Sequence, residues 1–75
     1  MIVFERTVDI SVDEDFLWSS YHYWASSEVG QWVSRNSLSE LKVSIGIDHR
    51  SLEHRLVVTA QLTPQNATFF KLRWE

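Results

Sequence analysis

The residues best suited to metal binding are histidines and carboxylates around one predicted turn. His49 and His54 lie close in the chain to Asp48 and Glu53, whereas His22 stands apart. Imidazole and carboxylate groups are common zinc ligands, but established sites combine them at characteristic spacings, and this spacing matches none of them. His54 also falls in the inward phase of a predicted strand, where a hydrogen-bonded core histidine is the commoner outcome. We therefore predict no metal site.

Acid–base or nucleophilic catalysis has little support in the sequence. Serine, histidine and aspartate are present, but no nucleophile elbow or glycine-rich phosphate loop accompanies them, and the chain has only two glycines. The absence of cysteine excludes a thiolate nucleophile and disulfide bonds. Asp13 and Asp15 could act as an acid–base pair, but capping of a helix N-terminus explains both fully. We predict a protein that is not an enzyme and uses no cofactor.

Basic residues around one aromatic side chain form an alternative binding face. They occupy the solvent-facing phase of the later predicted strands, and the set consists of Arg55, Phe69, Lys71 and Arg73. Cations beside an aromatic ring on an open sheet can hold a small ligand or single-stranded nucleic acid. The net charge of −3 has the wrong sign for non-specific phosphate binding. We therefore keep this face as the alternative and do not expect nucleic acid as the main partner.

The most unusual pattern is an uncharged face on the predicted helix. Exposed helix faces normally carry Glu, Lys and Arg, which have high helix propensity and form ion pairs between neighbouring turns. The residues opposite the apolar stripe are instead small or aromatic, and those predicted to form an interaction site are Phe16, Ser19, Tyr23, Ser26, Ser27 and Gly30. Small residues let another helix or sheet approach closely, so this face is predicted to meet a partner. A serine-rich face that is merely solvated is the competing interpretation.

The hydropathy pattern places these residues on one helix and four strands. Apolar and polar residues alternate over 2–12, 41–47, 52–62 and 68–74, as in half-buried strands, and residues 64–66 form a turn. Residues 16–34 show helical spacing after an acidic start. We predict an α+β domain of β-α-β-β-β order, with a four-stranded, mostly antiparallel sheet and one long amphipathic helix on one face. Arg6 interrupts the apolar phase of the first strand, which favours an edge position.

Length and composition indicate one small domain spanning residues 1–75. A chain of 75 residues supports a single hydrophobic core, and self-association is a common way for such domains to bury more surface. No apolar run approaches the ~18 residues of a membrane span, and the first residues do not resemble a signal peptide. With cysteine also absent, we expect a cytoplasmic location and no membrane partner.

These patterns together predict a small, acidic, non-catalytic protein–protein interaction module. It would form a homodimer or modulate a larger partner protein through the uncharged helix face. Stand-alone acidic domains of this length often occur among phage accessory proteins, an analogy that rests on size and composition alone.

Overall fold

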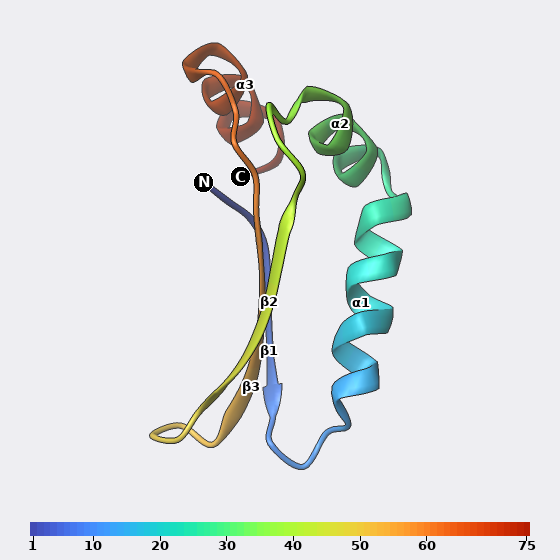
Figure 1. Ribbon diagram of the computed structural model, residues 1–75, viewed down its shortest axis with the longest axis vertical. Coiled ribbons are helices and arrows are strands. Elements are labelled where there is room, and N and C mark those ends of the chain that lie inside the picture. Colours follow the sequence, from blue (N-terminus) through green and yellow to red (C-terminus); the bar gives the residue numbers. More distant parts are fainter.

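The computed structural model describes all 75 residues and contains three strands and three helices. In chain order they are β1 (Ile2–Asp9), α1 (Glu14–Ser26), α2 (Glu28–Asn36), β2 (Lys42–Asp48), β3 (Glu53–Thr59) and α3 (Pro64–Trp74). Helix α1 runs alongside the sheet, and α2 and α3 lie at one end of the molecule (Figure 1). The predicted α+β class is confirmed, but the predicted β-α-β-β-β order is wrong. None of the helices has the combination of length and apolar character that crossing a membrane requires.

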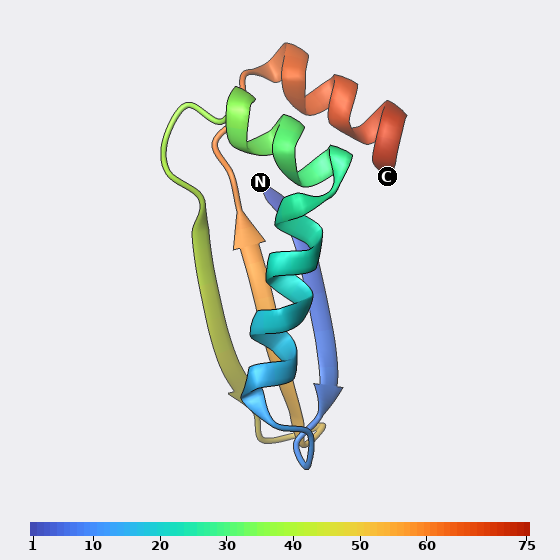
Figure 2. The ribbon, with the colours of Figure 1, turned by 90° about the vertical axis from the view of Figure 1, so that its right-hand side faces the viewer.

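The sheet is fully antiparallel and has the strand order β1-β3-β2. Since β3 lies in the centre, β1 and β2 are both edge strands, which confirms the edge position that Arg6 predicted. Arg6 and Ile45 are the neighbours of Leu56 on its two sides, and Leu56 is fully buried. Side chains alternate between the two faces of a strand, so this row belongs to the face that α1 covers (Figure 2).

The single long helix predicted over 16–34 is two helices that meet at Ser27. The backbone of Ser27 is extended, with φ −74° and ψ 167°, so the helical path is interrupted there. Its hydroxyl accepts a hydrogen bond from the Gly30 N–H and donates one to the Trp24 carbonyl oxygen. Ser27 is therefore the C-cap of α1 and the N-cap of α2. The tryptophans of 16–34 do not share one surface, because Trp18 is exposed, Trp24 is buried, and Trp32 belongs to the other helix.

Ser27→Ala is expected to lower the free energy of unfolding by about 1 kcal/mol, the usual cost of losing an N-cap side chain. Ser26→Ala is the matched control, since the Ser26 hydroxyl donates only to the His22 carbonyl oxygen within α1. Its effect should stay within roughly 0.5 kcal/mol, because alanine favours a helix. Urea unfolding followed by circular dichroism measures both. Equal effects of the two substitutions would contradict the double-cap role of Ser27.

The segment predicted as a fourth strand, 68–74, lies in helix α3. The Thr63 hydroxyl accepts a hydrogen bond from the Asn66 N–H at 3.2 Å, and Pro64 occupies the first helical turn. A Thr cap followed by Pro is a helix start, although these residues also suit a turn. Phe70 and Trp74 belong to the alternating pattern that suggested a strand, but they are also four residues apart. In a helix this spacing places them on one face, and their ring centroids lie 5.9 Å apart.

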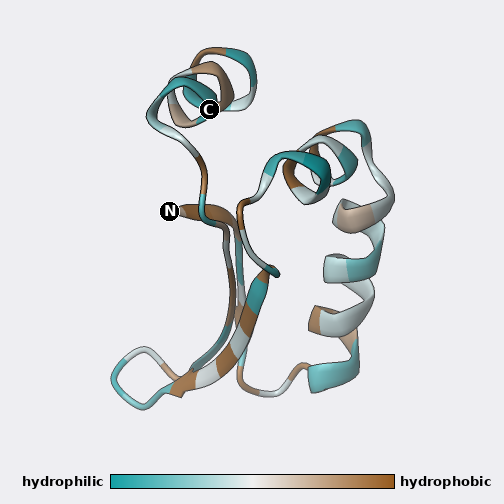
Figure 3. Cartoon of the chain, turned by 45° about the horizontal axis from the view of Figure 1, so that its top comes forward, coloured by the Kyte–Doolittle hydropathy of each residue, from teal (hydrophilic) through white to brown (hydrophobic).

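The hydrophobic core is small and lies between the sheet and the helices. Its buried side chains are Val3, Leu17, Trp24, Val33, Leu56, Val58, Ala60 and Phe70. Hydrophobic and hydrophilic residues alternate along the strands in Figure 3, as expected for a sheet with one covered face. An aromatic cluster extends the core to α3, where Trp32 lies 5.2 Å from both Phe69 and Trp74 between ring centroids. Helix α3 is thereby held mainly against α2.

Candidate interaction groove

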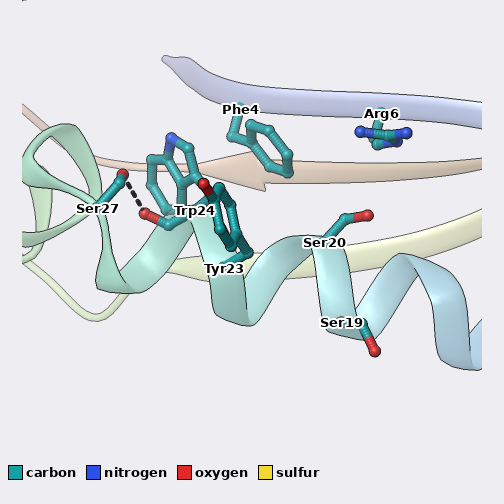
Figure 4. Close-up of a pocket in the computed structure, with 7 residues that line it drawn as sticks. All are labelled: Phe4, Arg6, Ser19, Ser20, Tyr23, Trp24 and Ser27. Carbon is teal, nitrogen blue, oxygen red and sulfur yellow. Dashed lines mark hydrogen bonds between the residues drawn. The ribbon is translucent and has the colours of Figure 1, made fainter.

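A groove of about 490 Å³ opens between α1 and the edge strand β1. Its lining residues are Phe4, Arg6, Ser19, Ser20, Tyr23, Trp24 and Ser27, and Figure 4 shows them along the two elements. The rings of Phe4 and Trp24 stack with their centroids 5.2 Å apart and their planes 17° from parallel. This stack joins the strand to the helix. It gives the groove an aromatic floor that is preformed in the isolated chain.

Arg6 is the one charged residue that lines the groove. Its guanidinium carbon lies 5.0 Å from the centre of the Phe16 ring, within the range of a cation–π interaction. The two ion pairs of the chain, Arg55 with Glu5 and Arg73 with Glu28, do not include it. The groove therefore offers a cation that has no acidic partner within the chain.

The serines of the groove differ in how their hydroxyl groups are used. Ser20 donates to the Phe16 carbonyl oxygen at 3.0 Å, and Ser27 caps the helix junction. Ser19 makes no hydrogen bond through its side chain and is exposed, and in Figure 4 it is turned away from β1. Tyr23, next to it on the surface, is 84% exposed. A partner on this side would meet a large aromatic ring surrounded by small side chains.

Most of the predicted interaction residues lie at this groove. Ser19, Tyr23 and Ser27 line it, and Phe16 lies under the Arg6 side chain. Two others have different surroundings. Ser26 is exposed outside the groove lining, and Gly30 is buried in the first turn of α2.

Gly30 has a role in packing rather than on an exposed surface. A β-carbon at this position would lie 2.1 Å from the Trp24 carbonyl oxygen and 2.7 Å from the Ala25 α-carbon. Real side chains do not approach backbone atoms so closely, so only glycine lets α2 start this near the end of α1. The prediction that Gly30 forms part of an exposed interaction face does not fit its burial.

The alternative basic face is not assembled by the fold. Arg55 lies on the outer face of β3, where its Nη2 donates to Glu5 Oε2 at 2.7 Å, and this bond raises the pKa of Arg55. Phe69, Lys71 and Arg73 belong to α3 instead of a strand. Since the expectation of a common sheet face depended on a fourth strand, its geometric basis disappears with that strand.

The histidine and carboxylate groups near the β2–β3 turn have separate roles, although Asp48 and Glu53 are opposite each other in the hairpin. Asp48 accepts hydrogen bonds from the backbone N–H groups of Arg50 and Ser51, which lower the pKa of its carboxyl. His54 points toward the core side of β3, and its Nδ1 is buried without a hydrogen-bond partner. No three His, Asp or Glu side chains converge in the way that a metal ion would require.

Four groove residues, Phe4, Arg6, Ser20 and Trp24, were not among the predicted site residues. Phe4 and Trp24 fit core patterns in their own segments, and nothing in the spacing shows that they stack on each other. Arg6 did carry a signal, because it interrupts an apolar phase of the first strand. An arginine in that position indicates a side chain that lies over apolar surface while its charge reaches an opening.

The groove is thus an aromatic and hydroxyl-lined surface with a single cation, beside a free sheet edge. Comparisons of the chain with protein-family models, with curated proteins and with solved structures gave no match.

Proposed function

We propose that this protein is a non-catalytic protein–protein interaction module that associates with a second copy of itself through the groove side. The groove side is defined as the surface formed by the groove residues together with Phe16 and the free edge of β1. The observation that carries the proposal is the exposure of Tyr23, at 84%, on a face of α1 that bears no charge. Large aromatic residues such as tyrosine are enriched where interfaces are buried.

The free edge of β1 adds polar groups to this apolar surface. Alternate backbone N–H and C=O groups of an edge strand lack partners in their own sheet and are open to another chain. Proteins usually protect such edges with charges, and β1 carries Glu5 and Arg6 there. The charge of Glu5 is balanced by its ion pair with Arg55. Arg6 then leaves the groove side with a net positive charge. That reduces the repulsion between two copies of a chain whose overall charge is −3.

The size of the molecule also favours use of this whole side. The molecule measures 38 × 23 × 21 Å, and the groove side runs along its longest dimension, because both α1 and β1 do (Figure 1). Only nine of the 75 residues are buried in the isolated chain. Association along the long side would add to a core that is small for independent stability.

Tyr23→Glu is expected to convert a dimer of the native chain into a folded monomer. The substitution places a carboxylate in the middle of the proposed interface, where burial without a partner costs several kcal/mol. Light scattering after size-exclusion chromatography measures the mass, and circular dichroism checks the fold.

Leu72→Glu is the matched control, because Leu72 is 83% exposed, almost the same as Tyr23, but lies on α3. It should leave the mass of the native protein unchanged. A monomeric native chain, or a dimer that both substitutions disrupt equally, would contradict self-association through the groove side. A native monomer would direct attention to a larger partner protein for the same surface.

A further inference from the structure

Opposite charges flank the groove side, with Arg6 inside it and Glu28 just beyond one end. Arg6 lies near the N-terminal part of α1, as its contact with Phe16 shows, and no acid pairs with it. Glu28 begins α2 at the other end, and its side chain is 76% exposed. In Figure 2 the start of α2 and the end of α3 lie on the same side of the molecule as β1. The segments that carry the cation and the acid therefore lie toward opposite ends of this side.

Glu28 keeps most of its capacity for a further partner. Its Oε1 accepts one hydrogen bond from Arg73 at 3.2 Å, and both side chains are more than half exposed. A carboxylate can accept about four hydrogen bonds, so one exposed contact leaves room for a second guanidinium. Arg6 has five N–H donors and no carboxylate to receive them.

We propose that two copies pack with their α1 helices antiparallel around a two-fold axis, so that Arg6 of each copy pairs with Glu28 of the other. This inference rests on the proposed self-association and specifies its geometry. From Phe16 to Ser26, α1 rises roughly 15 Å, and Glu28 begins α2 just beyond its end, so the midpoint between the two charges falls near residue 22 of α1. An axis there crosses the middle of the groove side, next to Tyr23.

The two-fold symmetry follows from the positions of the charges. In a two-fold symmetric interface, each contact between the two copies occurs twice. One cation and one acid at opposite ends of the surface therefore form two identical ion pairs, each between Arg6 of one copy and Glu28 of the other. A parallel arrangement would place Arg6 against Arg6 and Glu28 against Glu28. Between the two ends, serines at 19, 20 and 27 let the helices approach closely, and the Tyr23 rings fill the centre.

Charge reversal tests this geometry directly. In a dimer of the Arg6→Glu variant, two carboxylates face each other in each intermolecular pair. In a dimer of the Glu28→Arg variant, two guanidinium groups face each other. Each variant by itself is expected to raise the dimer dissociation constant by roughly a hundredfold, because the like charges face each other at both ends. Sedimentation equilibrium measures the constants, and circular dichroism verifies that each variant is folded.

Mixing the two variants provides the specific result. A heterodimer of Arg6→Glu with Glu28→Arg restores opposite charges in both pairs, so native mass spectrometry should show the heterodimer in large excess over either homodimer. The control pair is Lys42→Glu with Glu40→Arg, two exposed residues at and just before the start of β2, on the strand at the opposite edge of the sheet from β1. Its mixture should give homodimers and heterodimers in the statistical ratio.

The outcomes separate this inference from the proposed function. If the native dimer is disrupted by Tyr23→Glu but not by either charge reversal, self-association through the groove side stands and the antiparallel geometry is wrong. If both reversals weaken the dimer and the mixture does not recover it, the pairing of Arg6 with Glu28 is likewise wrong. A native monomer overturns both proposals.

Discussion

Trp24→Ala is expected to lower the free energy of unfolding by about 3–5 kcal/mol, the usual range for removing a buried tryptophan. Trp24 is 7% exposed, belongs to the core and stacks on Phe4 of β1. Its loss leaves a cavity between α1 and the sheet. A domain of this length has a total stability of roughly 4–11 kcal/mol, so the variant should be close to unfolding at physiological temperature. Urea unfolding followed by far-ultraviolet circular dichroism measures the change.

Trp18→Ala is the matched control for this prediction, because Trp18 lies on the same helix and is 39% exposed. It should cost no more than about 1–2 kcal/mol, since less apolar surface is removed from the interior. Comparable losses for the two tryptophans would show that the Phe4–Trp24 stack does not have the central role assigned to it. Because this stack is the floor of the groove, Trp24→Ala should also weaken any association through the groove side.

Gly30→Ala is expected to destabilise the protein by about 2 kcal/mol and to lower the melting temperature by roughly 8–16 °C. The added β-carbon would lie 2.1 Å from the Trp24 carbonyl oxygen, which is a backbone atom and cannot rotate away. Relief of this clash requires α2 to move relative to α1. The higher helix propensity of alanine offsets only about 1 kcal/mol of the steric cost. Differential scanning calorimetry gives the melting temperatures.

Gly46→Ala supplies the comparison, since a β-carbon at Gly46 meets no atom within 4 Å and its φ is not positive. Alanine there should be neutral or stabilising by up to about 1 kcal/mol, through its effect on the unfolded chain. A Gly30 variant that melts at or above the native temperature would mean that the junction of α1 and α2 tolerates a side chain. The close packing argued for Ser27 and Gly30 would then be wrong.

The position of Glu28 relative to the groove side depends on the junction between α1 and α2. Ser27 ends α1 and starts α2, and Gly30 lets α2 turn sharply away from the original axis. As a result Glu28 lies beyond the end of α1, where it pairs with Arg73 of α3. The position of the Glu28 carboxylate is therefore set by the bend between α1 and α2. A continuous helix would have placed it elsewhere around the axis.

Part of the fold could be predicted because its signals are local. Alternation over 2–12, 41–47 and 52–62 predicts three strands, which the structure has at Ile2–Asp9, Lys42–Asp48 and Glu53–Thr59. The aspartate at 13 with acidic neighbours identifies the start of α1. The side chain of Asp13 does accept a hydrogen bond from the Asp15 N–H, at 2.9 Å. The absence of charge on the outer face of α1 was also visible, because helix periodicity alone groups those residues.

The last segment could not be assigned by the same means. Over seven residues, alternation and helical spacing share positions, and Phe70 and Trp74 satisfy both patterns. The choice depends on which partners are available: β1 and β2 already occupy both sides of β3, and Trp32 offers an aromatic surface to a helix. The basic residues of this segment therefore lie on α3, away from Arg55.

The sequence by itself determined the α+β class, the edge character of β1 and the uncharged face of α1, because each depends on the spacing of residues within one segment. Only the tertiary structure decided that Phe4, Arg6 and Trp24 form a groove with that face. It also decided that the long helix divides at Ser27 and that the final segment is helical. These features arise from contacts between distant segments, and local periodicity carries no information about which buried faces will meet.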